Sequence, residues 1–180
     1  MLARIPRSGL HFLGSGSQSV AEHSHRVACI AFLLARRSDQ PVDEALLLRL
    51  CLFHDLPEAR TGDQNYVQRK YVRVDEARVL ADIERASSVG TEIVAAIREF
   101  EAGGSPEAQL ARDADQIDLL ALLREEMDLG NPRAQAWVGS CGQRIRTEAG
   151  QALAGEVLQT PADAWWFGDR HDPHWVCGKG

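Results

Sequence analysis

The chain has 180 residues, of which 44% are hydrophobic and 6% aromatic, so we expect residues 1–180 to form a single globular domain with a continuous core. The formal net charge is -6 and the Lys and Arg residues are scattered, which argues against binding to a nucleic-acid polymer. No apolar stretch reaches about 18 residues and no signal-peptide core is present near the first residue, so we expect a cytoplasmic protein without a membrane partner.

The first helical pattern covers residues from about 19 to 37. It begins at Ser19, which stands three residues before Glu22, and this is the spacing of a capping box. His23 then falls on the same face as the apolar residues, beginning with Val20. Most single histidines in such a position are ordinary core residues. His23 is therefore a candidate ligand only in combination with other residues.

A second helical pattern begins near Asp43, and its apolar run ends at His54 and Asp55. An imidazole and a carboxylate that are adjacent in sequence can both reach one cation, whereas burying them without compensation is costly. Pro57 cannot donate a hydrogen bond to the carbonyl of Phe53, so we expect the helix to kink or end at this pair.

A polar stretch over residues 64–75 has too little apolar content for a core element and is interpreted as an active-site loop. The third polar candidate, Asp115, shares an apolar stripe with Ala111 and Leu119. No run has the alternation typical of strands, so we predict an all-α bundle of about six or more helices. Besides the first two, helical patterns cover residues of about 74–87, 91–101, 106–127 and 133–158.

The C-terminal tail, about residues 160–180, contains the aromatic cluster Trp165-Trp166-Phe167. We expect this tail to pack either on the domain or on a second subunit.

Two histidines and two aspartates from three predicted helices, three of them on inward faces and Asp55 adjacent to His54, suggest one shared site. A divalent cation would compensate the cost of burying these groups together. Such a donor set suits Mn, Co, Ni, Fe or Zn better than Ca or Mg, which prefer oxygen ligands alone. The predicted ligands are His23, His54, Asp55 and Asp115.

The chain resembles the HD-domain phosphohydrolase superfamily, and more narrowly its small single-domain branch that contains 5'-deoxynucleotidases. The resemblance implies the metal tetrad above, a homodimer and hydrolysis of (deoxy)nucleoside 5'-monophosphates to nucleoside and phosphate. The stretches that carry it are IPRSGL (5–10), SVAEHSHRVA (19–28), LFHDLPEARTGD (52–63) and RDADQID (112–118).

By position, the resemblance implies that Glu58 is the catalytic carboxylate that positions or deprotonates the attacking water. Helical geometry agrees, because Glu58 would lie one turn beyond His54. The alternative is a surface ion pair of Glu58 with Arg60 or Arg26.

The resemblance also implies that Arg7 binds the substrate phosphate and that Asp63 contacts the sugar. Relatives often have Trp after this arginine, whereas Ser8 follows here, so sugar discrimination is open. Lys70 is a candidate second phosphate contact and His25 a candidate residue of the site lining.

Two other functions stay open. The same tetrad supports a (deoxy)nucleoside triphosphate triphosphohydrolase, although the few basic residues near the motifs, Arg7 and Lys70 among them, favour a monophosphate. A non-catalytic nucleotide-binding module would keep the metal as a structural element, and the presence of Glu58 argues against it.

Overall fold

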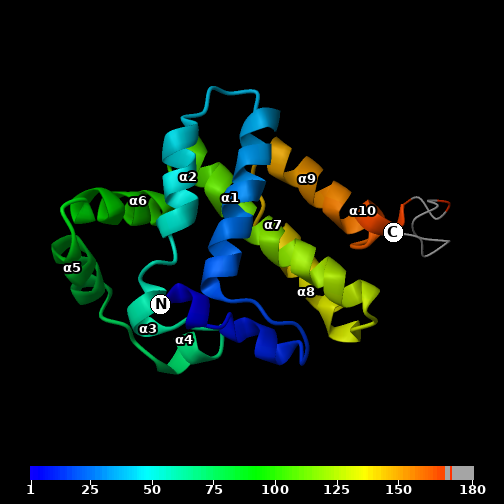
Figure 1. The fold of residues 1–180 in the computed structure, drawn as a ribbon, viewed down its shortest axis with the longest axis horizontal. Helices are drawn as coiled ribbons and strands as arrows, with labels where there is room; N and C mark the ends of the chain where they lie inside the picture. The colour runs from blue at the N-terminus through cyan, green and yellow to red at the C-terminus, as the bar shows by residue number, and fades with distance from the viewer. Residues whose placement is uncertain (169–170, 172–180) are drawn as a thin grey trace.

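The protein is described by a computed structural model over residues 1–168 and 171, with the side chain of Phe167 excluded. Helices dominate the described part of the chain, which confirms the predicted all-α class (Figure 1). The helices are η1 (Leu2–Arg4), η2 (Ser8–Phe12), α1 (Val20–Arg37), α2 (Glu44–Phe53), α3 (Glu58–Thr61), α4 (Gln68–Tyr71), α5 (Glu76–Ala86), α6 (Gly90–Ala102), α7 (Pro106–Asp128), α8 (Pro132–Gly142), α9 (Glu148–Gln159) and α10 (Ala164–Phe167).

Helix α7 is the centre of the bundle. It begins where Ser105 accepts a hydrogen bond from the amide of Ala108 and where Pro106 fits the first turn. It contacts α1, α2, α6, α8 and α9, and Figure 1 shows it running through the middle of the bundle. A helix surrounded in this way holds any polar group on its inner faces away from solvent. The largest fully buried apolar side chains are Leu34, Leu47, Leu50, Ile97, Ile117, Leu120 and Leu123.

The predicted boundaries of α1 and α2 are confirmed. The hydroxyl of Ser19 accepts from the amide of Glu22, and the carboxylate of Glu22 accepts from the amide of Ser19, which forms the capping box. Helix α2 ends at Phe53, and His54 is its C-cap. The chain then passes Pro57 and enters the short helix α3, so the His-Asp pair lies at a break between helices, as Pro57 predicted.

The N-terminal segment is attached to the start of α1 by backbone hydrogen bonds. The amide of Arg7 donates to the carbonyl of Gln18 over 2.8 Å, and the amide of Val20 donates to the carbonyl of Ile5 over 2.9 Å. These bonds bring Arg7 next to the break between α2 and α3, a position that local sequence does not specify.

The single helix predicted over 133–158 is wrong, because the structure has two helices, α8 and α9, joined by residues 143–147. The carboxylate of Asp113, only 1% exposed, accepts from the amides of Arg146 and Thr147 and from the hydroxyl of Thr147. The Thr147 hydroxyl in turn accepts from the amide of Gly150 and caps α9. A tertiary anchor on α7 thus interrupts the helical pattern.

The polar stretch 64–75 is mostly loop, as predicted, but it contains one short helix, α4. In the tail, Trp165 and Trp166 are 85% and 62% exposed and their rings stack on each other. These two side chains therefore do not join the core, and packing on a second subunit stays a prediction. Positions 169–170 and 172–180 of the tail lie outside the described residues. Among the described helices, none is long and apolar enough to cross a membrane.

Candidate metal centre and active site

The four predicted metal ligands converge where α1, α7 and the end of α2 meet. The Nε2 atoms of His23 and His54 lie 3.4 Å apart. An oxygen of Asp115 lies 3.2 Å from Nε2 of His23, and an oxygen of Asp55 lies 3.3 Å from Nε2 of His54 and 3.5 Å from Nε2 of His23. The ligand atoms of His23, His54 and Asp115 all lie within 4.8 Å of one another, so these three side chains can share one ion.

The hydrogen bonds of the two imidazoles fix which nitrogen faces the cluster. Nδ1 of His54 lies 2.8 Å from the carbonyl of Cys51, which can only accept, so this nitrogen carries the proton. Nδ1 of His23 lies 2.6 Å from the carboxylate of Asp118 and donates in the same way. In neutral imidazoles both Nε2 lone pairs then point at each other and at two carboxylates. A cation between them removes this repulsion, so the donor set fits a divalent metal.

The charge of the cluster follows from its burial and its contacts. Burial opposes protonation of His23, but its hydrogen bonds to Asp115 and Asp118 outweigh this effect and raise its pKa to about 9. Burial would raise the pKa of Asp115, yet the hydrogen bond and charge of His23 hold it well below its usual range. Without a metal, a proton on His23 therefore compensates the carboxylates, and a metal must displace it.

Glu58, the predicted catalytic carboxylate, is the first residue of α3 and lines the same cavity as His54, Asp55 and Asp115, a space of about 740 Å³. Its Oε2 is buried without a hydrogen-bond partner in the described chain. Burial, followed by the charges of Asp55 and Asp63, raises the pKa of Glu58 to about 8. Such a carboxyl group is a stronger base than an exposed glutamate once it loses its proton.

The alternative of a surface pair for Glu58 is not observed in the described chain. Arg26 pairs instead with Asp118 and Glu125, and Arg60 is exposed on α3.

A model described as "HD domain" matches residues 1–154. The chain belongs to the HD domain family. Residues 1–154 contain every ligand and site residue discussed above, so the match covers the whole cluster of this HD domain.

Known relatives agree with the resemblance found in the sequence. A 5'-deoxynucleotidase of Schizosaccharomyces pombe is 22% identical over 175 residues, which are 91% of this chain and 87% of that protein. A 5'-deoxynucleotidase of Danio rerio is 28% identical over 138 residues, 73% of this chain and 68% of that protein. A solved structure from Magnetospirillum magnetotacticum, described as a predicted metal-dependent phosphohydrolase, has a TM-score of 0.68 with 26% identity and covers 88% of this chain and 84% of its own. Family and neighbour together indicate a divalent metal.

Arg7 and Asp63 both line the cavity of this HD domain. One guanidinium nitrogen of Arg7 donates to Asp55 over 3.1 Å, and its other N–H groups are not used by that bond. Asp63 follows Gly62, whose φ of +71° suits glycine, and its carboxylate accepts from the amide of Ser8 over 2.7 Å. Asp63 thus holds the N-terminal segment, and with it Arg7, against the cavity.

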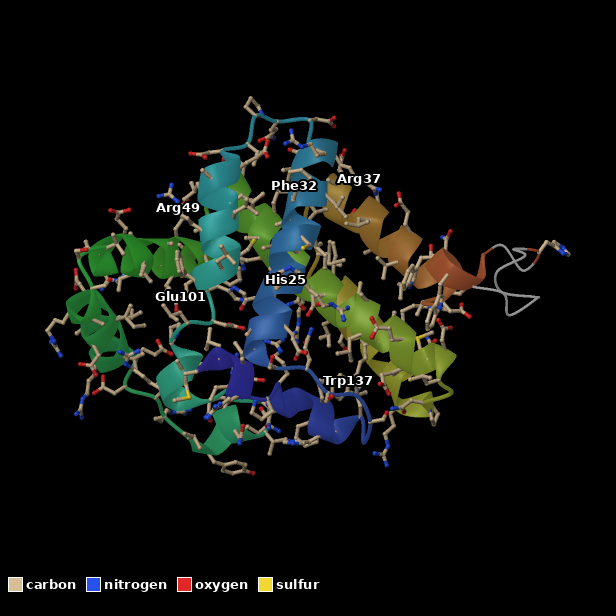
Figure 2. The ribbon with its side chains drawn as sticks, viewed as in Figure 1. His25, Phe32, Arg37, Arg49, Glu101 and Trp137 are labelled. Carbon is tan, nitrogen blue, oxygen red and sulfur yellow. The ribbon has the colours of Figure 1, made fainter. Side chains whose placement is uncertain are left out.

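Two weaker candidates lie elsewhere. The ammonium of Lys70 is 4.2 Å from the centroid of the Tyr66 ring, and Lys70 does not line this cavity. His25 is exposed on α1, with its ring near Cys29 (Figure 2). Of these two, neither is part of the site as the structure describes it.

Sequence reasoning missed Asp118, although this residue ends the quoted stretch 112–118. It is 1% exposed, and besides His23 its oxygens contact the amide of Gln18 at 3.0 Å and Nε of Arg26 at 2.6 Å. The available signal was its place three residues after Asp115, on an adjoining part of the same helix face. Asp118 orients His23 without facing the metal cluster itself.

The substitution Asp118→Asn is expected to weaken the affinity for metal about 10- to 100-fold. A neutral amide orients and polarises the imidazole of His23 less than a carboxylate does. Calorimetric titration with Mn²⁺ measures the effect, and Asp82→Asn, a surface substitution that removes an ion pair with Arg85, is the matched control. Equal metal affinity in the two variants would contradict the role of Asp118.

Several arginines that line the cavity were not predicted from the sequence as site residues. Arg69 and Arg73 donate to backbone carbonyls of their own segment, and Arg112 donates to the carbonyl of Glu101. The additional lining arginines are Arg69, Arg73, Arg112 and Arg144. The cavity therefore carries more positive charge than the motifs alone indicated. The number of basic residues consequently does not favour a monophosphate over a triphosphate substrate.

Proposed function

We propose that this HD domain is a metal-dependent 5'-nucleotidase that hydrolyses deoxynucleoside 5'-monophosphates to nucleoside and phosphate. The observation that carries the proposal is the convergence of His23, His54, Asp55 and Asp115 next to Glu58, whose Oε2 is buried without a hydrogen-bond partner among the described residues. The named activity of the yeast and zebrafish relatives supports the choice of substrate.

A bound divalent cation would polarise the phosphoryl group and make water more acidic, which is the general role of such ions in phosphate ester hydrolysis. His23, His54, Asp55 and Asp115 would hold it. Two imidazoles among four ligands favour a transition metal, Mn, Co, Ni, Fe or Zn, over Mg or Ca.

The chain's own residues supply the remaining steps. Glu58 takes a proton from the attacking water, for which its raised pKa prepares it. Arg7 lies beside Asp55, and the N–H groups that its bond to Asp55 does not use can bind the phosphate oxygens as negative charge develops on them. Asp63 keeps Arg7 in place through Ser8 and, by the resemblance, also accepts from a sugar hydroxyl.

The proposal is tested by incubating the protein with dAMP and with dATP in Mn²⁺, Co²⁺ or Ni²⁺ and separating the products. We expect orthophosphate and deoxyadenosine from dAMP and little turnover of dATP. Release of triphosphate from dATP would identify a triphosphohydrolase instead. Binding of dAMP without phosphate release in any metal would identify a binding module.

Two further properties are proposed with this function. Homodimer formation, a prediction from the resemblance, is consistent with the exposed rings of Trp165 and Trp166, and sedimentation would measure it. We also propose that the enzyme acts in the cytoplasm, as its sequence led us to expect, on nucleotides and not on nucleic-acid polymers or membranes.

A further inference from the structure

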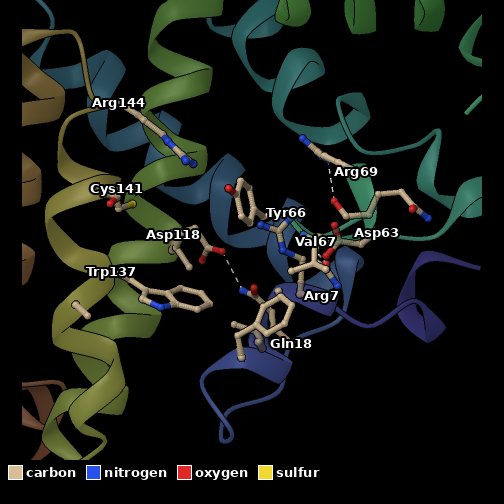
Figure 3. A pocket seen from close by; sticks show the side chains of 18 residues that line it. Arg7, Gln18, Asp63, Tyr66, Val67, Arg69, Asp118, Trp137, Cys141 and Arg144 are labelled. Carbon is tan, nitrogen blue, oxygen red and sulfur yellow. Dashed lines mark hydrogen bonds between the residues drawn. The ribbon is translucent and has the colours of Figure 1, made fainter. Parts of the chain in front are cut away.

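A second cavity, of about 590 Å³, lies beside the one that contains the metal ligands (Figure 3). The two cavities share several lining residues, so a ligand in one can extend into the other. The shared residues are Arg7, Asp63, Gln64, Arg69, Leu119 and Arg144. None of the four predicted metal ligands lines the second cavity.

The wall of this cavity is rich in aromatic and apolar side chains. Trp137 of α8 is partly buried against the core and extends into the cavity (Figure 3). Phe12 of η2 is 43% exposed, and Tyr66 precedes α4. Three aromatic side chains from distant segments thus surround one space. Core packing does not explain this, because Phe12 and Tyr66 remain exposed.

The floor of the cavity carries a fixed polar group. Gln18 is 8% exposed, and its amide nitrogen donates to Asp118, so the orientation of the amide is set. Among the described residues no donor to the side-chain Oε1 of Gln18 is found, whereas its backbone carbonyl accepts from the amide of Arg7. A flat aromatic wall beside one oriented amide suits a planar heterocycle that has both π faces and polar edges.

We propose that this second cavity binds the nucleobase of the substrate and that the indole of Trp137 is its stacking surface. The proposal rests on the proposed nucleotidase function. In a nucleoside 5'-monophosphate the sugar separates the phosphate from the base, so a phosphate at Arg7 directs the base away from the metal ligands. Figure 3 shows Arg7 and Asp63 on one side of the second cavity and Trp137 on the other, which matches this order.

Stacking predicts how the enzyme distinguishes its substrates. All bases offer a π face, so stacking on Trp137 favours a nucleotide over a sugar phosphate that lacks a base while discriminating little among bases. The volume of the cavity lies within the range typical of small-ligand sites.

The test compares dAMP with 2-deoxyribose 5-phosphate, which has the same phosphate and sugar but no base. We expect Trp137→Ala to raise KM for dAMP about 10- to 100-fold with kcat changed less than about threefold. Turnover of deoxyribose 5-phosphate should be equal to wild type, and Trp137→Phe should restore most of the affinity for dAMP. Tyr71→Ala, which removes an exposed aromatic side chain outside both cavities, is the control.

An equal effect of Trp137→Ala on the two substrates, or none on either, would overturn the proposal. If Trp137→Ala does not fold, Trp137→Phe still reports, through quenching of tryptophan fluorescence in EDTA. We expect dAMP but not deoxyribose 5-phosphate to quench the wild type, with a smaller change in Trp137→Phe. If the wild type hydrolyses neither compound, the proposed function is refuted. The fluorescence assay would then still show whether the second cavity binds a nucleobase.

Discussion

Replacing Glu58 with glutamine is expected to lower kcat for dAMP about 100- to 10,000-fold while metal affinity stays within about threefold of wild type. The side chain keeps its shape but loses the ability to accept a proton. Glu58 is the first residue of α3, immediately after Pro57, and its carboxyl group lies in the cavity without being one of the four predicted ligands. Steady-state kinetics with an independent metal titration measures both quantities.

The pH dependence gives a second readout for the same substitution. The pKa of Glu58 is raised to about 8 without a metal, and a nearby cation lowers it. Activity of the wild type should therefore rise with pH and level off below about pH 8, whereas the residual activity of Glu58→Gln lacks this rise. Glu92→Gln, an exposed position on α6, is the control and should behave as wild type. Full activity of Glu58→Gln would exclude Glu58 as the base.

Replacing His54 with alanine is expected to abolish both metal binding and turnover. His54 is 8% exposed, and its Nε2 faces His23 and Asp55, so alanine removes one of the two nitrogen donors of the cluster. Asp55→Ala should have the same effect and also leaves Arg7 without its carboxylate. Metal content after dialysis and phosphate release from dAMP measure the two losses. His25→Ala, an exposed histidine on α1, is the matched control.

Thermal melts at several pH values test the same site in the intact protein. The pKa of His23, about 9, lies above its ordinary value of 6.5, so its contribution to stability is complete below pH 6.5 and is lost as the pH rises through 9. The raised pKa of Glu58 has the same sign. The metal-free protein should therefore have a lower Tm at pH 9 than at pH 6.5.

Bound metal should reverse this fall in Tm with rising pH. The metal replaces the proton on His23, so it binds more tightly at higher pH. We expect the rise in Tm caused by Mn²⁺ to be larger at pH 8.5 than at pH 6.5 and to vanish in His54→Ala. A rise that is independent of pH, or one that persists in His54→Ala, would show that Mn²⁺ binds elsewhere.

Local patterns predicted most of the helices and the inward direction of the key residues. The capping box at Ser19, the proline at position 57 and the helical spacing around Asp115 act over a few residues, so a single sequence is enough to read them. The prediction of a single helix over residues 133–158 was wrong because a distant contact, not a local pattern, decides the structure there. Asp113 binds the amides of Arg146 and Thr147 from more than thirty positions away, and periodicity carries no sign of such a contact.

By itself, then, the sequence determined an all-α chain in which His23, His54 and Asp115 face inward and Asp55 directly follows His54, because helix phase depends on neighbours three and four residues apart. The tertiary structure alone decided which groups support and surround them. Asp118 reaches His23 across 95 positions, Arg7 is brought to Asp55 by backbone bonds to α1, and Trp137 enters a cavity next to Asp63. These contacts depend on how α1, α7 and α8 pack, and that packing is a property of the whole core.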